Sequence, residues 1–115
     1  MTAPTIVLAT FRELQDTAGP EFVAELVDTF LEEAPLMLAE LRAARAASNA
    51  DTFRRAAHSL KSNSQTFGAT TLAALARSLE LAGLAAAPAQ DDTALDALDA
   101  AYAQAASELK ALCHG

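Results

Sequence analysis

The chain has 115 residues, enough for one domain with a modest core, and it carries a net charge of −7. This charge disfavours nucleic acid and anionic membranes as partners, because both present phosphates that call for a basic protein surface. Hydrophobic residues make up 52% of the chain, but most are alanine and leucine, with five Phe, one Tyr and no Trp. Since alanine and leucine favour helices and few segments are rich in Val, Ile or aromatics, we predict a single all-α domain over residues 1–115.

The ends of the chain and its single cysteine bear on where the protein works. The N-terminal segment lacks the charged region of a secretory signal peptide, and no apolar run is as long as a membrane-spanning helix. Cys113 has no partner for an internal disulfide, which fits the reducing cytoplasm. Two histidines and one cysteine are also too few ligands for a structural zinc site. We therefore expect a cytoplasmic protein without an intrinsic metal or cofactor.

Apolar residues recur at helical spacing in five segments of the chain. We predict a short helix at 11–18, a long one from about 21 to 47, and further helices at about 50–67, 70–86 and 93–112. Short connections between long helices place them antiparallel to their neighbours. The predicted fold is therefore an antiparallel up-down four-helix bundle with a short extra N-terminal helix.

Turn and capping residues define the ends of these helices. Gly19-Pro20 separates the first two, and Asn49 or Asp51 is suited to cap the third. Gly68 is expected to end the third helix, with Thr70 or Thr71 capping the fourth. Pro35 falls inside the second helix, where it removes a backbone donor, so we expect that helix to be kinked or broken there.

The third predicted helix has one apolar and one polar face. At about 100° per residue, a core stripe is formed by Phe53, Ala57, Leu60, Ser64 and Phe67. His58 lies roughly 140° from the centre of this stripe, so its imidazole is expected to point to solvent. The same exposed face carries Arg54, Arg55, Lys61, Ser62 and Gln65. Taken alone, a histidine among basic residues is most often part of an ordinary solvated surface.

The residues around His58 favour a more specific interpretation. A solvent-facing imidazole offers a nucleophilic nitrogen near neutral pH, and basic neighbours compensate the charge of a phosphoryl group attached to it. Ser62 is small, so a partner surface can approach closely. If the third and fourth helices form a hairpin that turns at Gly68, Glu80 comes to lie across from His58. A carboxylate there would hold the proton of one ring nitrogen and leave the other free to attack, although an ordinary surface glutamate is an equal alternative.

The combined pattern closely resembles the signature of histidine phosphotransfer (HPt) domains. The matching positions are Ala57-His58-Ser59-Leu60-Lys61, Ser64, Phe67-Gly68-Ala69, Leu72 and Leu79-Glu80, and Phe30–Pro35 with Leu38 and Leu41 resembles the family's second helix. The resemblance implies that His58 is phosphorylated and that Lys61 is its basic companion. Glu80 matches a position where some members place a polar residue that hydrogen-bonds the histidine ring. The family usually has glycine after the lysine, and Ser62 in its place puts partner preference in doubt.

The function implied by the resemblance is that of a phosphocarrier between receiver-domain aspartates. Its partners would be response-regulator receiver domains and a hybrid histidine kinase, and Mg²⁺ would be bound by the receiver. We expect a monomer whose partner-binding face consists of Arg54, Arg55, Ser62 and Gln65. Because the chain has no Gly-rich phosphate loop, we expect no phosphorylation of itself from ATP.

Two other functions compete with the phosphocarrier. The first is the dimerisation domain of a sensor histidine kinase, which usually follows its histidine with an acidic residue and then a proline. In this chain Ser59 follows the histidine, and the next proline after it is Pro88. The second is a helical docking module whose histidine face binds a partner without phosphorylation.

Overall fold

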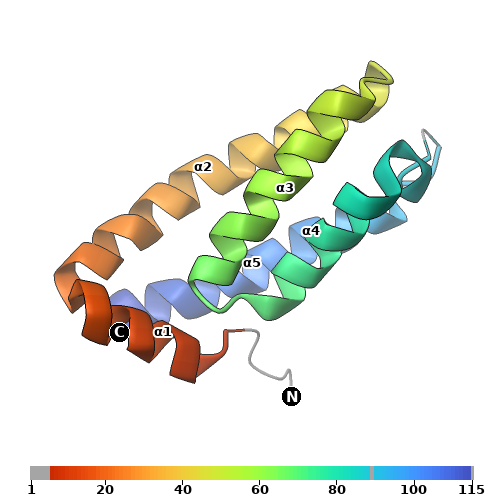
Figure 1. Ribbon diagram of the computed structural model, residues 1–115. Coiled ribbons are helices and arrows are strands. Elements are labelled where there is room, and N and C mark those ends of the chain that lie inside the picture. Colours follow the sequence, from red (N-terminus) through yellow and green to blue (C-terminus); the bar gives the residue numbers. More distant parts are fainter. Residues whose placement is uncertain (1–5, 89, 115) are drawn as a thin grey trace.

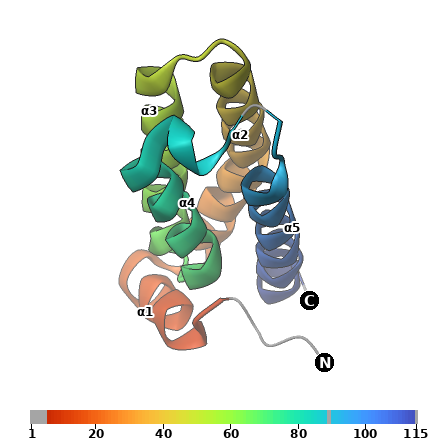
Figure 2. The same cartoon turned by 90° about the vertical axis from the view of Figure 1, so that its right-hand side faces the viewer.

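The helices follow one another in the predicted order in the computed structural model, which describes residues 6–88 and 90–114. Within these residues the chain forms α1 (Leu8–Ala18), α2 (Pro20–Ala46), α3 (Ala50–Thr66), α4 (Thr70–Ala82), the 3-10 turn η1 (Gly83–Ala86) and α5 (Thr93–His114). Helices α2 to α5 run alternately up and down, and α1 lies across one end of them (Figures 1 and 2). The prediction of an all-α bundle with an extra N-terminal helix is confirmed. Among the described residues, none of the helices combines the length and the apolar character needed to cross a membrane.

Two of the predicted helix junctions form as expected. Gly19, with a φ of +95°, ends α1, and Pro20 is the first residue of α2. Before α3, the side chain of Asn49 accepts a hydrogen bond of 3.1 Å from the backbone N–H of Thr52. Both junctions depend on contacts within a few residues, which is why the sequence alone predicts them.

The start and the end of α4 differ from the prediction. Neither Thr70 nor Thr71 caps the helix, because the residue before its first turn is Ala69, which has no capping side chain. Ala69 is buried and pairs with Ile6 in an isolated antiparallel β-bridge, so contacts from the N-terminal segment decide where α4 begins. The helix ends at Ala82 and not at residue 86, since the next residue, a glycine with a φ of +63°, turns the chain into η1.

A kink or a break was expected at Pro35; helix α2 runs past this residue without a break, so the second of these two expectations is wrong. The proline has no N–H to donate to the carbonyl of Leu31, one turn earlier. The hydroxyl of Tyr102 on α5 donates to that carbonyl over 3.2 Å and takes the place of the missing donor. Tyr102 is also held by its ring, which meets Phe30 edge-on at 6.0 Å between centroids.

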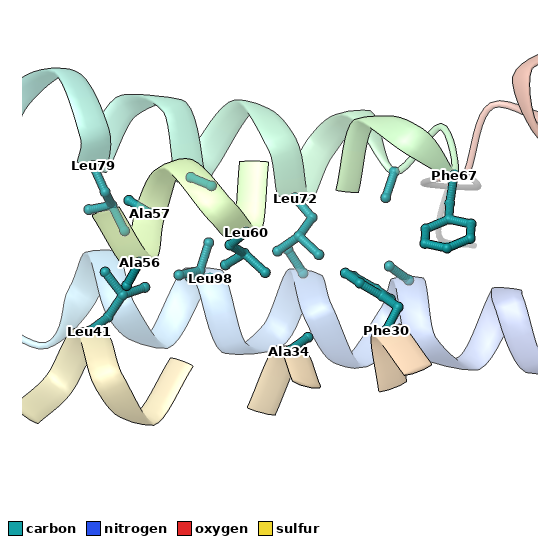
Figure 3. Close-up of a cluster of buried hydrophobic side chains, with 14 of the residues drawn as sticks. Phe30, Ala34, Leu41, Ala56, Ala57, Leu60, Phe67, Leu72, Leu79 and Leu98 are labelled. Carbon is teal, nitrogen blue, oxygen red and sulfur yellow. The ribbon is translucent and has the colours of Figure 1, made fainter. Parts of the chain in front are cut away.

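The core lies between the four long helices, as Figure 3 shows for the cluster around Leu60, Leu72 and Leu98. The stripe predicted on α3 is buried at all of its positions, which are Phe53, Ala57, Leu60, Ser64 and Phe67. Ser64 satisfies its hydroxyl by donating to the carbonyl of Leu60 over 2.6 Å. Phe22, which fits the apolar spacing of α2, is instead 51% exposed. Burial of the stripe leaves the opposite face of α3 to solvent.

The N-terminal segment ties down the turn between α3 and α4. The N–H of Val7 donates to the carbonyl of Gly68 over 2.8 Å, beside the β-bridge between Ile6 and Ala69. Gly68 has a φ of +78°, and a Cβ at this position would stand 2.9 Å from the carbonyl oxygen of Val7. Only glycine fits there, both for its backbone conformation and for its close approach to the segment. The register of the α3–α4 hairpin is therefore held from outside the hairpin.

Candidate functional site

The hairpin of α3 and α4 presents His58 on its outer surface. Ala57 and Leu60, its neighbours on the opposite face of α3, are buried and hold the helix in one rotation against the bundle. The side chain of His58 is 59% exposed, which confirms that the imidazole faces solvent. An exposed imidazole on a packed helix is open to a large partner while its backbone stays in place.

Glu80 of α4 joins His58 to Lys61. Its Oε2 lies 2.5 Å from Nδ1 of His58, and its Oε1 accepts a hydrogen bond of 2.6 Å from Nζ of Lys61. Glu80 and Lys61 are both mostly covered, at 22% and 19% side-chain exposure. The hairpin prediction anticipated a carboxylate near the histidine, but nothing in the sequence linked Lys61 to that carboxylate.

The charge of Glu80 determines which ring nitrogen of His58 carries the proton in their contact. The hydrogen bond from Lys61 is the largest effect and lowers the pKa of Glu80 below its ordinary value; partial burial opposes it, and the contact with His58 lowers the pKa further. Glu80 is therefore ionised at neutral pH and acts only as an acceptor. The proton in the contact with Glu80 then belongs to Nδ1 of His58, so in the neutral form of the ring the lone pair lies on Nε2.

The other residues predicted for this face lie around the cluster, and among the described residues none of them forms a hydrogen bond or an ion pair with His58. Arg54 and Arg55, one turn before it, are exposed, as are Ser62 and Gln65 one and two turns after it. The guanidinium of Arg54 lies over Gly83 of η1, so closely that a Cβ on Gly83 would stand 3.0 Å from Nε. The sequence did not predict this contact between Arg54 and Gly83. Gly83 itself was the only feature of the sequence that could have indicated it.

Within the part of the chain that the structure describes, no group of three or more His, Cys, Asp or Glu side chains is placed to hold a metal ion. His114 is one of the three potential zinc ligands of the sequence, and its side chain is outside what the structure describes. The chemistry available to the cluster around His58 is thus that of a nucleophilic imidazole, a carboxylate and an ammonium group.

This arrangement is that of a helical bundle with an exposed histidine on the outer surface of a hairpin. The Hpt domain family model matches residues 25–114, which is most of the chain. The chain is therefore a member of the Hpt domain family, whose members are phosphocarriers in histidine phosphorelays and interact with receiver domains and histidine kinases. Comparisons with curated proteins and with solved structures gave no match. The match leaves out α1 and the first residues of α2.

Proposed function

We propose that this chain accepts a phosphoryl group on His58 from the aspartate of one receiver domain and passes it to the aspartate of another. The observation that carries the proposal is the contact of Nδ1 with an ionised Glu80 on an otherwise exposed ring. It orients the imidazole and places the lone pair on Nε2. A histidine of an ordinary solvated surface would have no such anchor.

The transfer is a displacement at phosphorus. The lone pair of Nε2 forms a bond to the phosphorus of the aspartyl phosphate, and the acyl oxygen–phosphorus bond breaks, with its electron pair leaving on the aspartate carboxylate. Nδ1 keeps its proton, so the phosphorylated ring is an imidazolium whose N–H still donates to Glu80. The carboxylate thereby stabilises positive charge that develops on the ring during attack, in the manner of a carboxylate behind a catalytic histidine. The reverse sequence returns the phosphoryl group to a second receiver.

Lys61 and the receiver both contribute to neutralising the charge of the phosphoryl group. Lys61 is one turn from His58 and donates to the same carboxylate, so its ammonium group lies near the incoming phosphoryl oxygens while it remains shared with Glu80. Mg²⁺, bound by the receiver, would supply further charge neutralisation during the transfer. The face formed by Arg54, Arg55, Ser62 and Gln65 would meet the receiver or the hybrid kinase that carries it. We expect the exchange to take place in the cytoplasm and with a monomeric carrier.

The test is transfer of labelled phosphate from a phosphorylated receiver domain. The wild-type chain should take up the label on histidine within the time of mixing, and His58→Gln should take up none while remaining helical by circular dichroism. His114→Gln, which removes the other histidine of the chain, serves as the matched control and should transfer normally. Absence of label on the wild-type chain with every receiver of the genome would refute the proposal.

A second incubation distinguishes the competing functions. With ATP alone, a phosphocarrier stays unlabelled, whereas a sensor-kinase fragment that retained catalysis would become labelled. Binding of a receiver without any transfer would instead support a docking module.

A further inference from the structure

Phosphorylation changes the charge balance of the cluster around His58. With the imidazole neutral, as nucleophilic attack requires, the charges of the Glu80 carboxylate and the Lys61 ammonium group sum to zero, and these two groups are engaged with each other over 2.6 Å. Transfer of a PO₃⁻ unit with no loss of a proton adds one negative charge at Nε2. The ammonium of Lys61 is already shared with Glu80, so the phosphorylated cluster lacks one cation.

The surroundings of the hairpin do not supply that cation. Residues 50–82, which form α3, α4 and the turn between them, contain four Lys or Arg and two Asp or Glu. The hairpin therefore has a net charge of +2, and the rest of the chain carries −9 of the total of −7. The two arginines of α2 are engaged elsewhere, Arg42 by Asp96 and Asp99 of α5, and Arg45 by Asp92. A phosphoryl group on His58 thus lies in a strongly anionic protein and depends on cations of the hairpin itself.

Arg54 and Arg55 are the two remaining cations within one turn of His58. At about 100° per residue, Arg54 and Lys61 lie to one side of His58 on α3, and Arg55 lies to the other. Lys61 reaches Glu80 and Arg54 reaches Gly83, so the side shared by Arg54 and Lys61 is the one that faces α4. Arg54 is therefore on the same flank as the carboxylate cluster, and Arg55 is on the flank toward α2.

The position of Arg54 leaves its charge available. Its guanidinium lies over Gly83, with Nε and Nη2 at 3.0 and 3.1 Å from where a Cβ would be. Within the described residues, Arg54 forms no salt bridge and no hydrogen bond to a carboxylate. A move of the guanidinium from the glycine toward His58, one turn along the same helix, breaks no ion pair.

We propose that Arg54 is the cation that neutralises the charge added at His58, and that it thereby stabilises the phosphorylated carrier relative to the phosphorylated receiver. The proposal rests on the proposed function of His58. In the resting chain the guanidinium is held over Gly83. When Nε2 carries the phosphoryl group, the guanidinium binds the phosphoryl oxygens, for which its planar donors are well suited. Arg55 remains on the opposite flank, in contact with the partner.

The test measures how phosphate divides between His58 and a receiver aspartate. Each variant is mixed with one phosphorylated receiver, and the ratio of phosphohistidine to phosphoaspartate is read at the plateau, before hydrolysis. At low salt, Arg54→Gln should lower this ratio about 1.5- to fivefold, the range expected for one exposed ion pair. Arg54→Lys should restore most of the ratio. Arg12→Gln on α1 makes the same change in net charge outside the hairpin and should leave the ratio unchanged.

Salt dependence separates the proposed role from a structural one. At about 0.5 M salt the screening length falls below ~5 Å, so the difference between Arg54→Gln and the wild type should shrink. A merely structural arginine would lower the melting temperature and leave the salt dependence of the ratio unaltered. An unchanged ratio for Arg54→Gln, or an equal loss for Arg12→Gln, would overturn the inference while transfer to wild-type His58 kept the proposed function intact. Failure of the wild type to accept label would count against the proposed function itself.

Discussion

The hydrogen bond from Tyr102 to the carbonyl of Leu31 offers a sharp test of how α2 tolerates Pro35. Tyr102→Phe keeps the ring against Phe30 and removes only the hydroxyl that donates over 3.2 Å. A hydrogen bond of this kind contributes about 1 kcal/mol net, and partial exposure of Tyr102 lets water replace some of it. We expect Tyr102→Phe to lower the free energy of unfolding by ~1 kcal/mol, which corresponds to roughly 4 °C in melting temperature for a domain of this size.

Pro35→Ala supplies the second arm of a double-mutant cycle. Alanine restores the N–H that the Leu31 carbonyl lacks, and Pro35 is exposed, so little packing is lost. Since proline in a helix interior is about 3 kcal/mol less favourable than alanine, and Tyr102 offsets part of this, Pro35→Ala should stabilise the chain by about 2 kcal/mol. In that background the loss from Tyr102→Phe should fall close to zero.

Urea unfolding followed by circular dichroism measures all four chains of the cycle. A coupling free energy of about 1 kcal/mol between the two positions is expected. If Tyr102→Phe cost the same in both backgrounds, the hydroxyl would not be compensating for the proline. The continuity of α2 would then need another explanation.

Three further predictions concern the core, the carboxylate and the hairpin turn. Leu60→Ala should lower the free energy of unfolding by about 2–5 kcal/mol in urea titration, because the side chain is fully buried, and a loss near zero would contradict its place in the core. The hydrogen bond from Lys61 lowers the pKa of Glu80, so its contribution to stability is present above the ordinary glutamate pKa of about 4.3 and is lost as the pH falls through the lowered folded value. Glu80→Gln should remove this acid-side dependence, and parallel pH curves for the two proteins would refute it. Gly68→Ala should destabilise the chain by more than ~1 kcal/mol, since its φ is +78° and its Cβ would stand 2.9 Å from the oxygen of Val7. A melting temperature equal to that of the wild type would show that the N-terminal segment moves to make room for the added Cβ.

The sequence by itself determined the features that depend on interactions between residues close together in the chain. Helical periodicity placed the core stripe of α3 and, with it, the outward direction of His58. Local turn chemistry placed the ends at Gly19-Pro20 and Asn49. The HPt pattern in the α3–α4 segment was likewise recognisable from the sequence, and the family match includes this segment. These features follow from residues within one or two turns of each other, whose relation the helix itself dictates.

Contacts between segments distant in sequence were decided only by the tertiary structure. The predicted cap at Thr70 or Thr71 does not form, because Ala69 precedes the helix and pairs with Ile6. The helix does not break at Pro35, where Tyr102 of another helix supplies the missing donor. The link from Lys61 to Glu80 depends, in the same way, on the rotation and register of two packed helices. Periodicity shows which face a residue occupies, but not which rotamer it adopts or which partner on the neighbouring helix it meets. For this protein, the outward position of His58 is a property of the sequence, and its hydrogen-bonding and charge environment is a property of the packed hairpin.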